Sequence, residues 1–528
     1  MNSLMSCLQN NDVNYIEYGK NSKRTFNEIY DDVLLVSCYL REKGIACNDR
    51  IGLLCSNCYE YILIDLACIL CGYVLVSFHL SDYRCSSNNL LDTYNLKLLI
   101  VDETEVKINS DKEIILKMDQ IISEIATLDK YCINKLPKCS PFTDEDLFSI
   151  IFTSGSTGSP KSLAVKFKCP SEFIRICINK FKMNNTDKVL LFLPMSQFSS
   201  RCYVYAAIMI GFNIAVVRPD ELMWGLRKYK PTAFQAVPFV YEQLHESFRS
   251  ILYNSKTMLI FYYIYLLLKK VLPRVILTEI QQLLFKNIYA TLGGNIRFMI
   301  SGAAPICPNI LKAFRDFGLT IYEGYGLVET GMIALNYEEH NRIGSVGKVL
   351  DNKSVEIDEN GQIIVRSHYL WGNRYINAHA EDSAKIFIDK NCIATGDVGH
   401  IDKDGYLFIT GRMKDIIILS TGCKIHPLLI EKKLCTSALI KQAVVLGDYM
   451  SSLVAVIVCN DNACTYEQLK PEIVKVNKTL AAEYKIKKFL ISEIEFTIEN
   501  GMMTSNMKIN RKKVHNYFKE YMIKYDNM

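Results

Sequence analysis

The chain has 528 residues, enough for more than one domain and for a large buried core. Apolar residues make up 49% of it and charged residues 22%, which is typical of an ordinary soluble globular protein. The net charge of +5 is too small to indicate a nucleic-acid partner, and the first twenty residues lack the basic and apolar regions of a secretory signal. We therefore expect a cytoplasmic protein that does not bind nucleic acid.

The first hundred residues alternate between helical and strand patterns. Thr25 and Glu28 form a capping box before apolar residues at helical spacing, and Gly44 ends that helix. The next predicted elements are a strand at 50–55, a helix at 59–72 and strands at 74–78 and 96–102. This alternation predicts a parallel sheet covered by helices.

Nineteen cysteines occur, and two Cys-x-x-Cys pairs have a spacing that zinc sites use: Cys55 with Cys58, and Cys68 with Cys71. The second pair lies in an apolar stretch, where cysteine behaves as a small hydrophobic residue. Only nine residues separate the pairs, and they look helical. We therefore expect free thiols in a reducing cytosol rather than a zinc site.

A stretch rich in glycine and serine directly follows a predicted buried strand at 147–152. It reads TSGSTGSPKS from Thr153 to Ser162, and it departs from the P-loop pattern because Pro160 stands where the second glycine belongs. A flexible linker has a similar composition. The preceding strand, the hydroxyl groups and Lys161 favour a loop that binds a polyphosphate.

Beyond this loop the strand pattern continues and then changes. Strands are predicted at 188–194, 213–219, 233–238 and 296–305. Residues 344–367 contain short strands separated by Gly and Asn/Asp turns, which is typical of a small antiparallel sheet. After about residue 412 the chain has a compact α+β pattern, with strands at 442–448 and 453–460 and a helix at 466–485.

The eleven apolar residues Met258–Leu268 are too few for a helix that spans a bilayer. One interpretation is a core helix packed on the sheet. The other is an interfacial helix that makes a peripheral membrane contact, with Lys269, Lys270 and Arg274 beside lipid headgroups.

Four polar stretches follow the loop in order: YEGYGLVETG from Tyr322, TGDVGHIDKDGYLFITGR from Thr395, KDIIILSTGCKIHP from Lys414 and TSNMKINRKK from Thr504. Each is weak evidence alone. Together with TSGSTGSPK, LPMSQFSS and ISGAAP, they make the chain resemble the adenylate-forming superfamily of acyl-CoA synthetases, luciferases and adenylation domains of peptide synthetases. The resemblance extends from about Thr25 to Lys512.

This resemblance implies an α/β fold with two domains. Residues 1–412 would form a large N-terminal domain of layered, mostly parallel sheets with helices and a small antiparallel subdomain. Residues 413–528 would form a small, mobile α+β lid. The implied reaction has two steps. A carboxylate attacks the α-phosphate of ATP to give acyl-adenylate and pyrophosphate, and a thiol, usually that of coenzyme A, then displaces AMP.

The resemblance also implies binding residues. The loop would hold the β- and γ-phosphates, adenine would lie between the 301–305 and 322–325 stretches, and Asp397 and Arg412 would hold the ribose. The implied residues for ATP or AMP are Thr153, Ser154, Gly155, Ser156, Thr157, Gly158, Lys161, Gly302, Ala303, Ala304, Tyr322, Glu323, Gly324, Tyr325, Asp397 and Arg412. The implied acyl pocket consists of Gln197, Phe198, Val237 and Gly324.

Lys508, Thr157 and Glu329 are the catalytic residues that the resemblance implies. Glu329 would hold Mg²⁺, a hard cation that suits one carboxylate together with phosphates and water. Lys508 would bridge the acyl carboxylate and the α-phosphate, and would neutralise charge where the new bond forms. Lys414 would be the hinge of the lid, and Gly422 would line the thiol tunnel, a role that suits a residue without a side chain.

Two positions depart from the family pattern. Val328 stands where the family usually has threonine before the magnesium-binding glutamate. This change removes one hydroxyl donor near the α-phosphate, and such a loss costs about 2–4 kcal/mol in comparable oxyanion sites. Gln197 stands where a histidine is common, and because this residue borders the carboxylate pocket, the change bears on the acid substrate.

The acid is predicted to be a fatty acid of medium or long chain. The QFSS turn lacks the aspartate that would pair with the ammonium of an amino acid, and an unpaired ammonium in a pocket is costly. Residues 237–244, 293–306 and the LSTGCKIHP stretch resemble long-chain fatty acyl-CoA synthetases, and an aryl acid stays open. Arg201 would either pair with a second carboxylate on the substrate or form an exposed salt bridge.

The sequence thus predicts an acid–thiol ligase that uses ATP, Mg²⁺ and coenzyme A, with a small carboxylic acid as its other substrate. A second interpretation keeps the adenylation but loads the acyl or aryl group onto the phosphopantetheine of an acyl carrier protein. A third is a catalytically silent homologue that binds nucleotide or acyl chains, for which Val328 is the reason.

Overall fold

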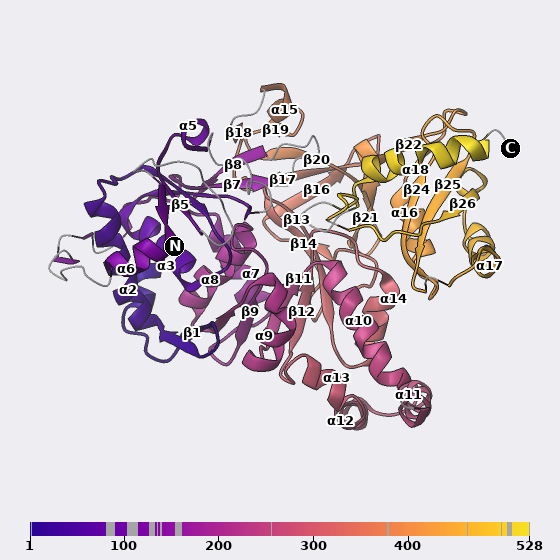
Figure 1. The fold of residues 1–528 in the computed structure, drawn as a ribbon, viewed down its shortest axis with the longest axis horizontal. Coiled ribbons are helices and arrows are strands. Elements are labelled where there is room, and N and C mark those ends of the chain that lie inside the picture. Colours follow the sequence, from indigo (N-terminus) through magenta and orange to yellow (C-terminus); the bar gives the residue numbers. More distant parts are fainter. Residues whose placement is uncertain are drawn as a thin grey trace.

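The computed structural model describes residues 1, 3–80, 90–102, 115–125, 133–134, 136–137, 140–153, 161–254, 256–376, 380–461, 463–497, 499–503 and 509–526. Figure 1 shows a large body of sheets and helices that contains the N-terminus, and a smaller unit, from α16 onward, that carries the C-terminus. We call the elements α16 to α18 the C-terminal unit. The predicted α/β fold with mostly parallel sheets is confirmed.

The first large sheet, called sheet A, is parallel through its centre and antiparallel at both edges. Its described strands run in the order β15 (Lys348–Val349), β14 (Gly331–Leu335), β13 (Ile321–Leu327), β12 (Phe298–Ser301), β11 (Ala233–Ala236), β9 (Lys188–Leu191), β10 (Asn213–Val216), β1 (Tyr15–Tyr18) and β2 (Ser22–Thr25). The strands predicted at 188–194, 213–219, 233–238 and 296–305 all lie in this sheet.

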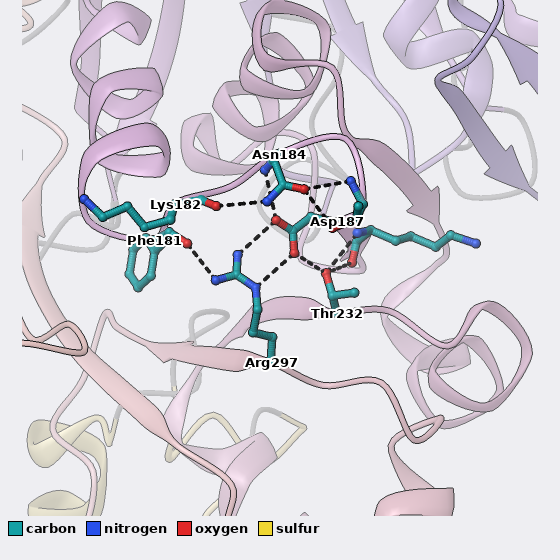
Figure 2. Close-up of polar contacts among 8 residues, drawn as sticks. Phe181, Lys182, Asn184, Asp187, Thr232 and Arg297 are labelled. Atoms are coloured by element: carbon teal, nitrogen blue, oxygen red, sulfur yellow. Dashed lines mark hydrogen bonds and ion pairs between the residues drawn. The ribbon is translucent and has the colours of Figure 1, made fainter.

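Asp187 is the centre of a polar cluster that joins the segments before three neighbouring strands of sheet A (Figure 2). Thr232 Oγ1 donates to Asp187 Oδ1 at 2.8 Å, and Arg297 donates to both carboxylate oxygens at 3.1 and 2.9 Å. Arg297 also donates to the Phe181 carbonyl at 2.8 Å. Because these side chains directly precede β9, β11 and β12, they fix the amino ends of parallel strands. The carboxyl ends are then left for a binding site, as is usual in parallel sheets.

The second large sheet, called sheet B, has the same character, with parallel strands ending in an antiparallel edge. Its described strands run in the order β18 (Tyr375–Ile376), β8 (Lys161–Lys166), β7 (Leu147–Thr153), β4 (Val74–Ser77), β3 (Arg50–Leu54), β5 (Leu96–Val101) and β6 (Ile115–Lys117).

The remaining described strands form three smaller sheets. They are β16 (Lys353–Ile357), β17 (Gln362–Ser367), β20 (Cys392–Ile401), β19 (Phe387–Asp389) and β21 (Leu407–Arg412) in an antiparallel sheet, β22 (Ile417–Ile418) with β23 (Lys424–Ile425), and β24 (Ile440–Leu446), β25 (Leu453–Cys459) and β26 (Ile486–Ile491) in the C-terminal unit. The antiparallel sheet predicted from residues 344–367 is therefore present, and β20 and β21 extend it.

Helices cover these sheets and fill the space between them. Those described are α1 (Leu4–Leu8), α2 (Phe26–Glu42), α3 (Tyr59–Cys71), α5 (Leu90–Tyr94), α6 (Met118–Ile125), α7 (Pro170–Asn179), α8 (Phe198–Ile210), α9 (Leu222–Tyr229), α10 (Pro238–Tyr253), α11 (Lys256–Leu268), α12 (Arg274–Leu284), α13 (Lys286–Thr291), α14 (Pro308–Asp316), α15 (Ala380–Ala384), α16 (Pro427–Leu434), α17 (Tyr466–Asn477) and α18 (Arg511–Asp526), with 3₁₀ turns η3 (Pro219–Glu221), η4 (Met413–Asp415) and η5 (Ala482–Tyr484).

The main hydrophobic core joins the two large sheets. It contains side chains from both sheets and from α2, α3, α7 and α8. Twelve of the thirteen residues of α3 are buried, because this helix has neighbours on all sides. A second core covers the other face of sheet A and contains side chains of α9, α10, α13 and α14.

For two predicted helices, the structure confirms the start of one and corrects the end of the other. The capping box of Thr25 and Glu28 is confirmed at the start of α2. The helix predicted at 466–485 is too long, because α17 ends at Asn477. The Asn477 side chain bonds both backbone groups of Ile486, at 2.8 and 2.9 Å, and so turns the chain into β26.

Arg201 is neither exposed nor available to a substrate, so both expectations for it are wrong. Its guanidinium is fully buried and donates to both oxygens of Asp65, at 3.0 and 2.6 Å. Tyr205 donates to the same carboxylate at 2.6 Å, and Arg201 also donates to Ser149 at 2.6 Å. Arg201 on α8 therefore neutralises a buried acid on α3, and it holds two helices of the core together.

The expectation of a core helix at Met258–Leu268 is also wrong. The segment forms α11, whose main contacts are with α10 and α12. Tyr265 is the one residue of this helix that is buried in the structure as described.

The cysteines of the second Cys-x-x-Cys pair, Cys68 and Cys71, are buried in α3. Burial raises the pKa of the Cys68 thiol well above its usual value. Within the part of the chain that the structure describes, no group of three His, Cys, Asp or Glu side chains could hold a metal ion.

Candidate active site

The ends of the predicted phosphate loop are held side by side. Thr153, at the end of β7, and Lys161, at the start of β8, are direct partners across the antiparallel β7–β8 pair. The loop residues Ser154, Gly155, Ser156, Thr157 and Gly158 lie outside the described residues, and so does Lys508. The chain therefore enters and leaves the loop at neighbouring strands of sheet B.

Lys161 and Glu329 are brought together by a residue that the sequence analysis did not identify, Tyr375. Its hydroxyl donates to Glu329 Oε1, and the Lys161 ammonium lies 5.1 Å from the centre of its ring. Tyr375 belongs to the two-residue strand β18, which pairs with β8. So short a strand leaves no periodic pattern, and for this reason the sequence carried no signal for it.

The Glu329 carboxyl is buried, and burial raises its pKa, while the hydrogen bond from Tyr375 lowers it in part. Removal of the carboxylate from water favours its neutral form. A divalent cation would reverse this effect, because it stabilises the ionised form directly. The donor set therefore fits a magnesium ion that takes one carboxylate from the protein and its other ligands from phosphate and water.

Asp397, Tyr325 and Arg412 form a second polar cluster. Tyr325 donates to Asp397 Oδ2 at 2.7 Å, and Arg412 Nε donates to Oδ1 at 2.9 Å. Asp397 and Arg412 face each other across the β20–β21 pair. The Asp397 side chain is 4% exposed but the Arg412 side chain is 41% exposed, so the arginine can reach a ligand while it orients the acid. Burial, together with the nearby Asp397 charge, raises the pKa of Tyr325 and keeps its proton in place.

The Asp397 cluster can recognise a vicinal diol. Each carboxylate oxygen accepts two hydrogen bonds, so Asp397 keeps acceptor capacity beyond its bonds to Tyr325 and Arg412. Two adjacent hydroxyl groups, as in a ribose, match the spacing of one carboxylate. Asp397 and Arg412, the two residues that the resemblance implied for the ribose, lie opposite each other on adjacent strands.

Two buried side chains on neighbouring strands have oxygen atoms without a described partner, Ser301 Oγ on β12 and Glu323 Oε2 on β13. These residues are register partners in the last parallel pair of the two strands, where β12 ends and β13 continues. Buried polar atoms of native proteins are normally bonded, so such a pair marks a place where a polar ligand completes the bonding. Gly302 and Ala303 follow directly, and Ala303 has a left-handed φ of 68°, a conformation that a residue with a side chain rarely adopts.

Tyr322, Gly324 and Ala304 lie in the same neighbourhood. The Tyr322 side chain is buried in the main core, while Gly324 is closely covered by Met332 and Leu335, whose atoms would lie 3.1 Å from an added Cβ. A side chain at Gly324 would therefore push into β14. This close packing explains why a glycine is needed there.

The predicted acyl-pocket residues begin two helices. Gln197 precedes α8, and Val237 precedes α10. Phe198 packs edge-on against the Trp371 ring, with ring centres 5.2 Å apart, and the backbone N–H of Trp371 donates to the Glu329 carbonyl at 2.8 Å. Trp371 therefore contacts both Phe198 and Glu329, so the predicted acyl pocket lies next to the predicted magnesium site. Val237 adjoins Gly302, whose N–H points to the Ala236 carbonyl at 3.4 Å.

Val328 lies in the turn between β13 and β14 and packs, partly buried, against the main core. The fold accommodates its isopropyl group.

Lys414 lies in η4, and burial lowers its pKa. Gly422 has a φ of 84° and open space around its Cα, so the turn, rather than close packing, requires the glycine.

The C-terminal unit touches the large body beside Glu323. Burial raises the pKa of Glu323 to about 7, and the positive charge of Lys432, on α16, lowers it in part. Asn309 donates to the Thr436 carbonyl at 2.9 Å, and the Cys307 thiol points to the Cys435 carbonyl at 3.4 Å. No local sequence pattern indicates Lys432, because its partner lies more than a hundred positions earlier in the chain.

This arrangement defines an α/β protein with a polar site at the strand ends that suits a nucleotide. The comparisons with known proteins give the family. A model described as AMP-binding enzyme matches residues 6–370, and one described as AMP-binding enzyme C-terminal domain matches residues 414–525. The chain belongs to the AMP-binding enzyme family, and the resemblance to adenylate-forming enzymes is confirmed.

Curated relatives are similar over most of their length. Long-chain-fatty-acid–CoA ligase FadD15 of Mycobacterium tuberculosis is 26% identical over 90% of this chain and 87% of its own. Long chain acyl-CoA synthetase 1 of Arabidopsis thaliana is 25% identical over 96% of this chain and 87% of its own. Long-chain-fatty-acid–CoA ligase 1 of Homo sapiens is 26% identical over 91% and 79%, respectively.

Solved structures share the fold at lower identity. The o-succinylbenzoate CoA synthetase MenE of Bacillus subtilis, in complex with its acyl-adenylate intermediate, superposes with a TM-score of 0.73 at 18% identity over 97% of both chains. The anthranilate CoA ligase AuaEII, in complex with anthranoyl-AMP, gives a TM-score of 0.76 at 17% identity over 98% of this chain and 97% of that one.

In the described part of the chain, no single helix has the length and apolar composition to cross a membrane. The pair α10 and α11, bent by 110°, meets the criterion by combined length and composition only.

Proposed function

We propose that the chain is an acid–thiol ligase that uses ATP and Mg²⁺ to convert a medium- or long-chain fatty acid into its acyl-adenylate and then transfers the acyl group to coenzyme A in the cytoplasm. The observation that carries this proposal is the cluster of Asp397, Tyr325 and Arg412, because three strands bring together a diol-binding group in a member of the AMP-binding family. The relatives named as long-chain acyl-CoA ligases support the fatty acid and coenzyme A as substrates.

In the first step the nucleotide would be held at both ends. Asp397 accepts hydrogen bonds from the ribose hydroxyls, while Arg412 and Tyr325 hold its carboxylate in position. The Ser301 hydroxyl and Glu323, beside Gly302, Ala303 and Ala304, offer polar atoms to adenine. The loop from Thr153 to Lys161 binds the β- and γ-phosphates, with hydroxyls from Ser154, Ser156 and Thr157.

Three residues would act on the negative charge of the phosphates: Glu329, Lys161 and Lys508. Glu329 would hold Mg²⁺, and when bound the ion neutralises the triphosphate and the departing pyrophosphate. Tyr375 fixes the Glu329 carboxylate and lies under the Lys161 ammonium, so one residue aligns both groups. Lys508 would place its charge between the acyl carboxylate and the α-phosphate, where the new bond forms.

The C-terminal part, residues 413–528, would act as a lid that turns about Lys414 between the two steps. Lys508 would serve only the first step, and Gly422 would line the thiol path in the second. Lys508→Ala is then expected to abolish adenylate formation while thioester formation from supplied acyl-AMP is largely kept. Equal loss of both half-reactions would contradict the moving lid.

The test of the proposed function is pyrophosphate release with ATP and Mg²⁺, measured for straight-chain acids from hexanoate to stearate, for benzoate and for amino acids. Each acid is assayed with and without coenzyme A, and products are identified by mass. Acyl-CoA from one window of chain lengths supports the proposal. Acyl-AMP that accumulates despite coenzyme A would indicate that a carrier protein is the acyl acceptor. Absence of pyrophosphate release with every acid would indicate a catalytically silent homologue.

A pair of variants tests the residue that carries the proposal. Asp397→Asn removes the charge that holds the ribose, and it is expected to raise the KM for ATP about tenfold or more, because charged hydrogen bonds are worth about 1.5–3 kcal/mol. Asp351→Asn is the matched control, since Asp351 is 94% exposed in a side-chain ion pair with Lys180. Equal KM values in the two variants would contradict the assignment of Asp397.

A further inference from the structure

The helices α11 and α12 expose apolar side chains to an unusual extent. The large hydrophobic side chains that are exposed in the described structure number 24, and 11 of them lie between residues 253 and 283. Figure 1 shows both helices at the periphery, below α10 and α13 and away from the sheets. Contiguous apolar surface of this kind marks a site of interaction, whereas single exposed residues do not.

The exposed residues of α11 form one continuous stripe. Ile260, Phe261, Ile264, Leu267 and Leu268 are all exposed, and their spacing of three, four and seven positions places them on one face of the helix. Val271, which is 82% exposed, extends the stripe by a further turn. The opposite face is anchored to the body through Met258, Tyr262, Tyr265 and Leu266, which pack in the second core. The stripe is therefore held outward by the fold.

The helix α12 continues the apolar surface. Val275, Ile276 and Leu283 are exposed, while Leu277, Ile280 and Leu284 pack inward against the second core. The two helices contact each other directly. Together they present outward-facing apolar side chains, as an interfacial helical pair does, while their inner faces pack on the second core.

The charged residues around α11 and α12 indicate what kind of surface the stripe contacts. Residues 256–286 contain five basic residues, Lys256, Lys269, Lys270, Arg274 and Lys286, and one acidic residue, Glu279. The lysines at 256, 270 and 286 are exposed, at the ends of the helices that carry the stripe. Apolar residues framed by lysines match a membrane surface with anionic headgroups. A second copy of this chain would bring the same positive charges face to face in a symmetric pair.

A hollow on the same surface has a volume of about 460 Å³. It is lined by Tyr263, Leu266 and Leu267, with Lys269, Lys270 and Asp316 beside them. Lys269 pairs with Asp316, so Lys270 is the cation that is more exposed there. An apolar wall next to a lysine suits an acyl chain and its anionic headgroup.

We propose that the stripe of α11, continued by α12, docks the protein on an anionic lipid surface. The helices would lie in the plane of the interface with the apolar stripe among the acyl chains and the lysines among the headgroups. This inference stands independently of the proposed ligase activity, because it depends on the surface alone.

The test uses the full chain and sedimentation with vesicles of phosphatidylcholine, with and without phosphatidylserine. The apolar variant is Leu267→Glu with Val271→Glu, and its control is Val13→Glu with Tyr449→Glu, which are 75% and 82% exposed elsewhere. The charge variant is Lys256→Glu with Lys270→Glu, and its control is Lys475→Glu with Lys478→Glu, both on the exposed side of the C-terminal unit. Circular dichroism verifies that every variant is folded.

We expect the unaltered chain to bind the phosphatidylserine vesicles more strongly than the neutral ones. The apolar and charge variants are each expected to lower the partition coefficient at least about tenfold, while both controls leave it unchanged. Failure to bind either vesicle overturns the proposal, and so does equal loss in variants and controls. Equal binding to neutral and anionic vesicles contradicts the anionic surface. A dimer that Leu267→Glu dissolves, without vesicle binding, assigns the stripe to a second copy of the chain instead.

Discussion

The helices α3 and α11 have the same length of thirteen residues and are both strongly apolar, yet the fold treats them in opposite ways. α3 is buried between the two large sheets and exposes little besides Glu60, whereas α11 buries only Tyr265 among the residues the structure describes. The helices also differ in charge. α3 contains an acid, Asp65, which Arg201 neutralises in the core, while α11 has lysines only at or beyond its ends.

The comparison shows that an apolar helix sequence indicates that the helix is removed from water. It does not identify which surface covers the apolar side chains. For α3 this surface is supplied by strands that come earlier and later in the chain. For α11 the body supplies a neighbour on one face only. The experiments below measure how different the two environments are, beginning with the largest expected effect on stability.

Arg201→Ala should be the most damaging change. It leaves the Asp65 carboxylate buried without its cation, and breaking a buried pair in this way costs about 3–5 kcal/mol. The free energy of unfolding, measured with urea, checks the loss. The double variant Arg201→Met with Asp65→Leu removes both charges and should recover part of it. A loss below about 1 kcal/mol for Arg201→Ala would show that the α3 environment is less dry than its burial indicates.

Truncating one leucine in each helix compares the two environments directly. Leu66 on α3 is fully buried, so Leu66→Ala is expected to lower the free energy of unfolding by about 2–5 kcal/mol. Leu267 on α11 is 67% exposed, so Leu267→Ala should change it by no more than about 0.5 kcal/mol. Similar losses in both variants would mean that α11 is covered in solution.

The helix α10, which carries α11, holds a carboxyl that lacks the close cation Asp65 has. Burial raises the pKa of Glu242 from 4.5 to about 7, with the neighbouring Glu246 adding to the rise and Lys441 opposing it. The folded state therefore binds more protons than the unfolded state between these values, so stability from this group is present below pH 4.5 and is lost as pH rises through 7.

Glu242→Gln removes this dependence. The variant should melt at a higher temperature than the unaltered chain at pH 8, and the difference should vanish at low pH, where Glu242 is protonated in both states. Glu359→Gln, at an exposed position outside α10, is the control. A difference that stays constant from acid to alkaline pH would contradict the raised pKa.

The smallest effect on stability is expected from Leu267→Cys. The new thiol on α11 should react readily with iodoacetamide in the native protein, while Cys68 on α3 should react only after unfolding, because it is buried and its pKa is raised. Mass spectrometry of labelled peptides measures both rates. Fast labelling of Cys68 in the native protein, or protection of the new thiol without vesicles, would contradict the conclusion that α3 is buried and α11 is exposed.

Much of the fold was accessible from local patterns. The capping box of α2 and the apolar runs of the parallel strands each act over a few residues, so the sequence displays them directly. Asp397 and Arg412 were implied as ribose-binding residues by the family resemblance, and the structure adds that they face each other in the hairpin of β20 and β21.

The rest depends on contacts between distant parts of the chain. Arg201 was misjudged because its partner Asp65 lies 136 positions away, and nothing near Arg201 reveals it. Tyr375 was missed because β18 consists of two residues. The placement of α11 depends on which faces of sheet A other helices already occupy, and this is a property of the whole fold.

The strand β13 makes two kinds of contact. Tyr325 completes the Asp397 cluster, and Glu323, two residues earlier, faces Lys432 of the C-terminal unit. Binding equilibria that share an element obey reciprocity. If a ligand at Asp397 favours one position of the C-terminal unit by some factor, that position raises the affinity for the ligand by the same factor. Restraining the unit against Glu323 would therefore change nucleotide affinity without altering any residue that touches the nucleotide.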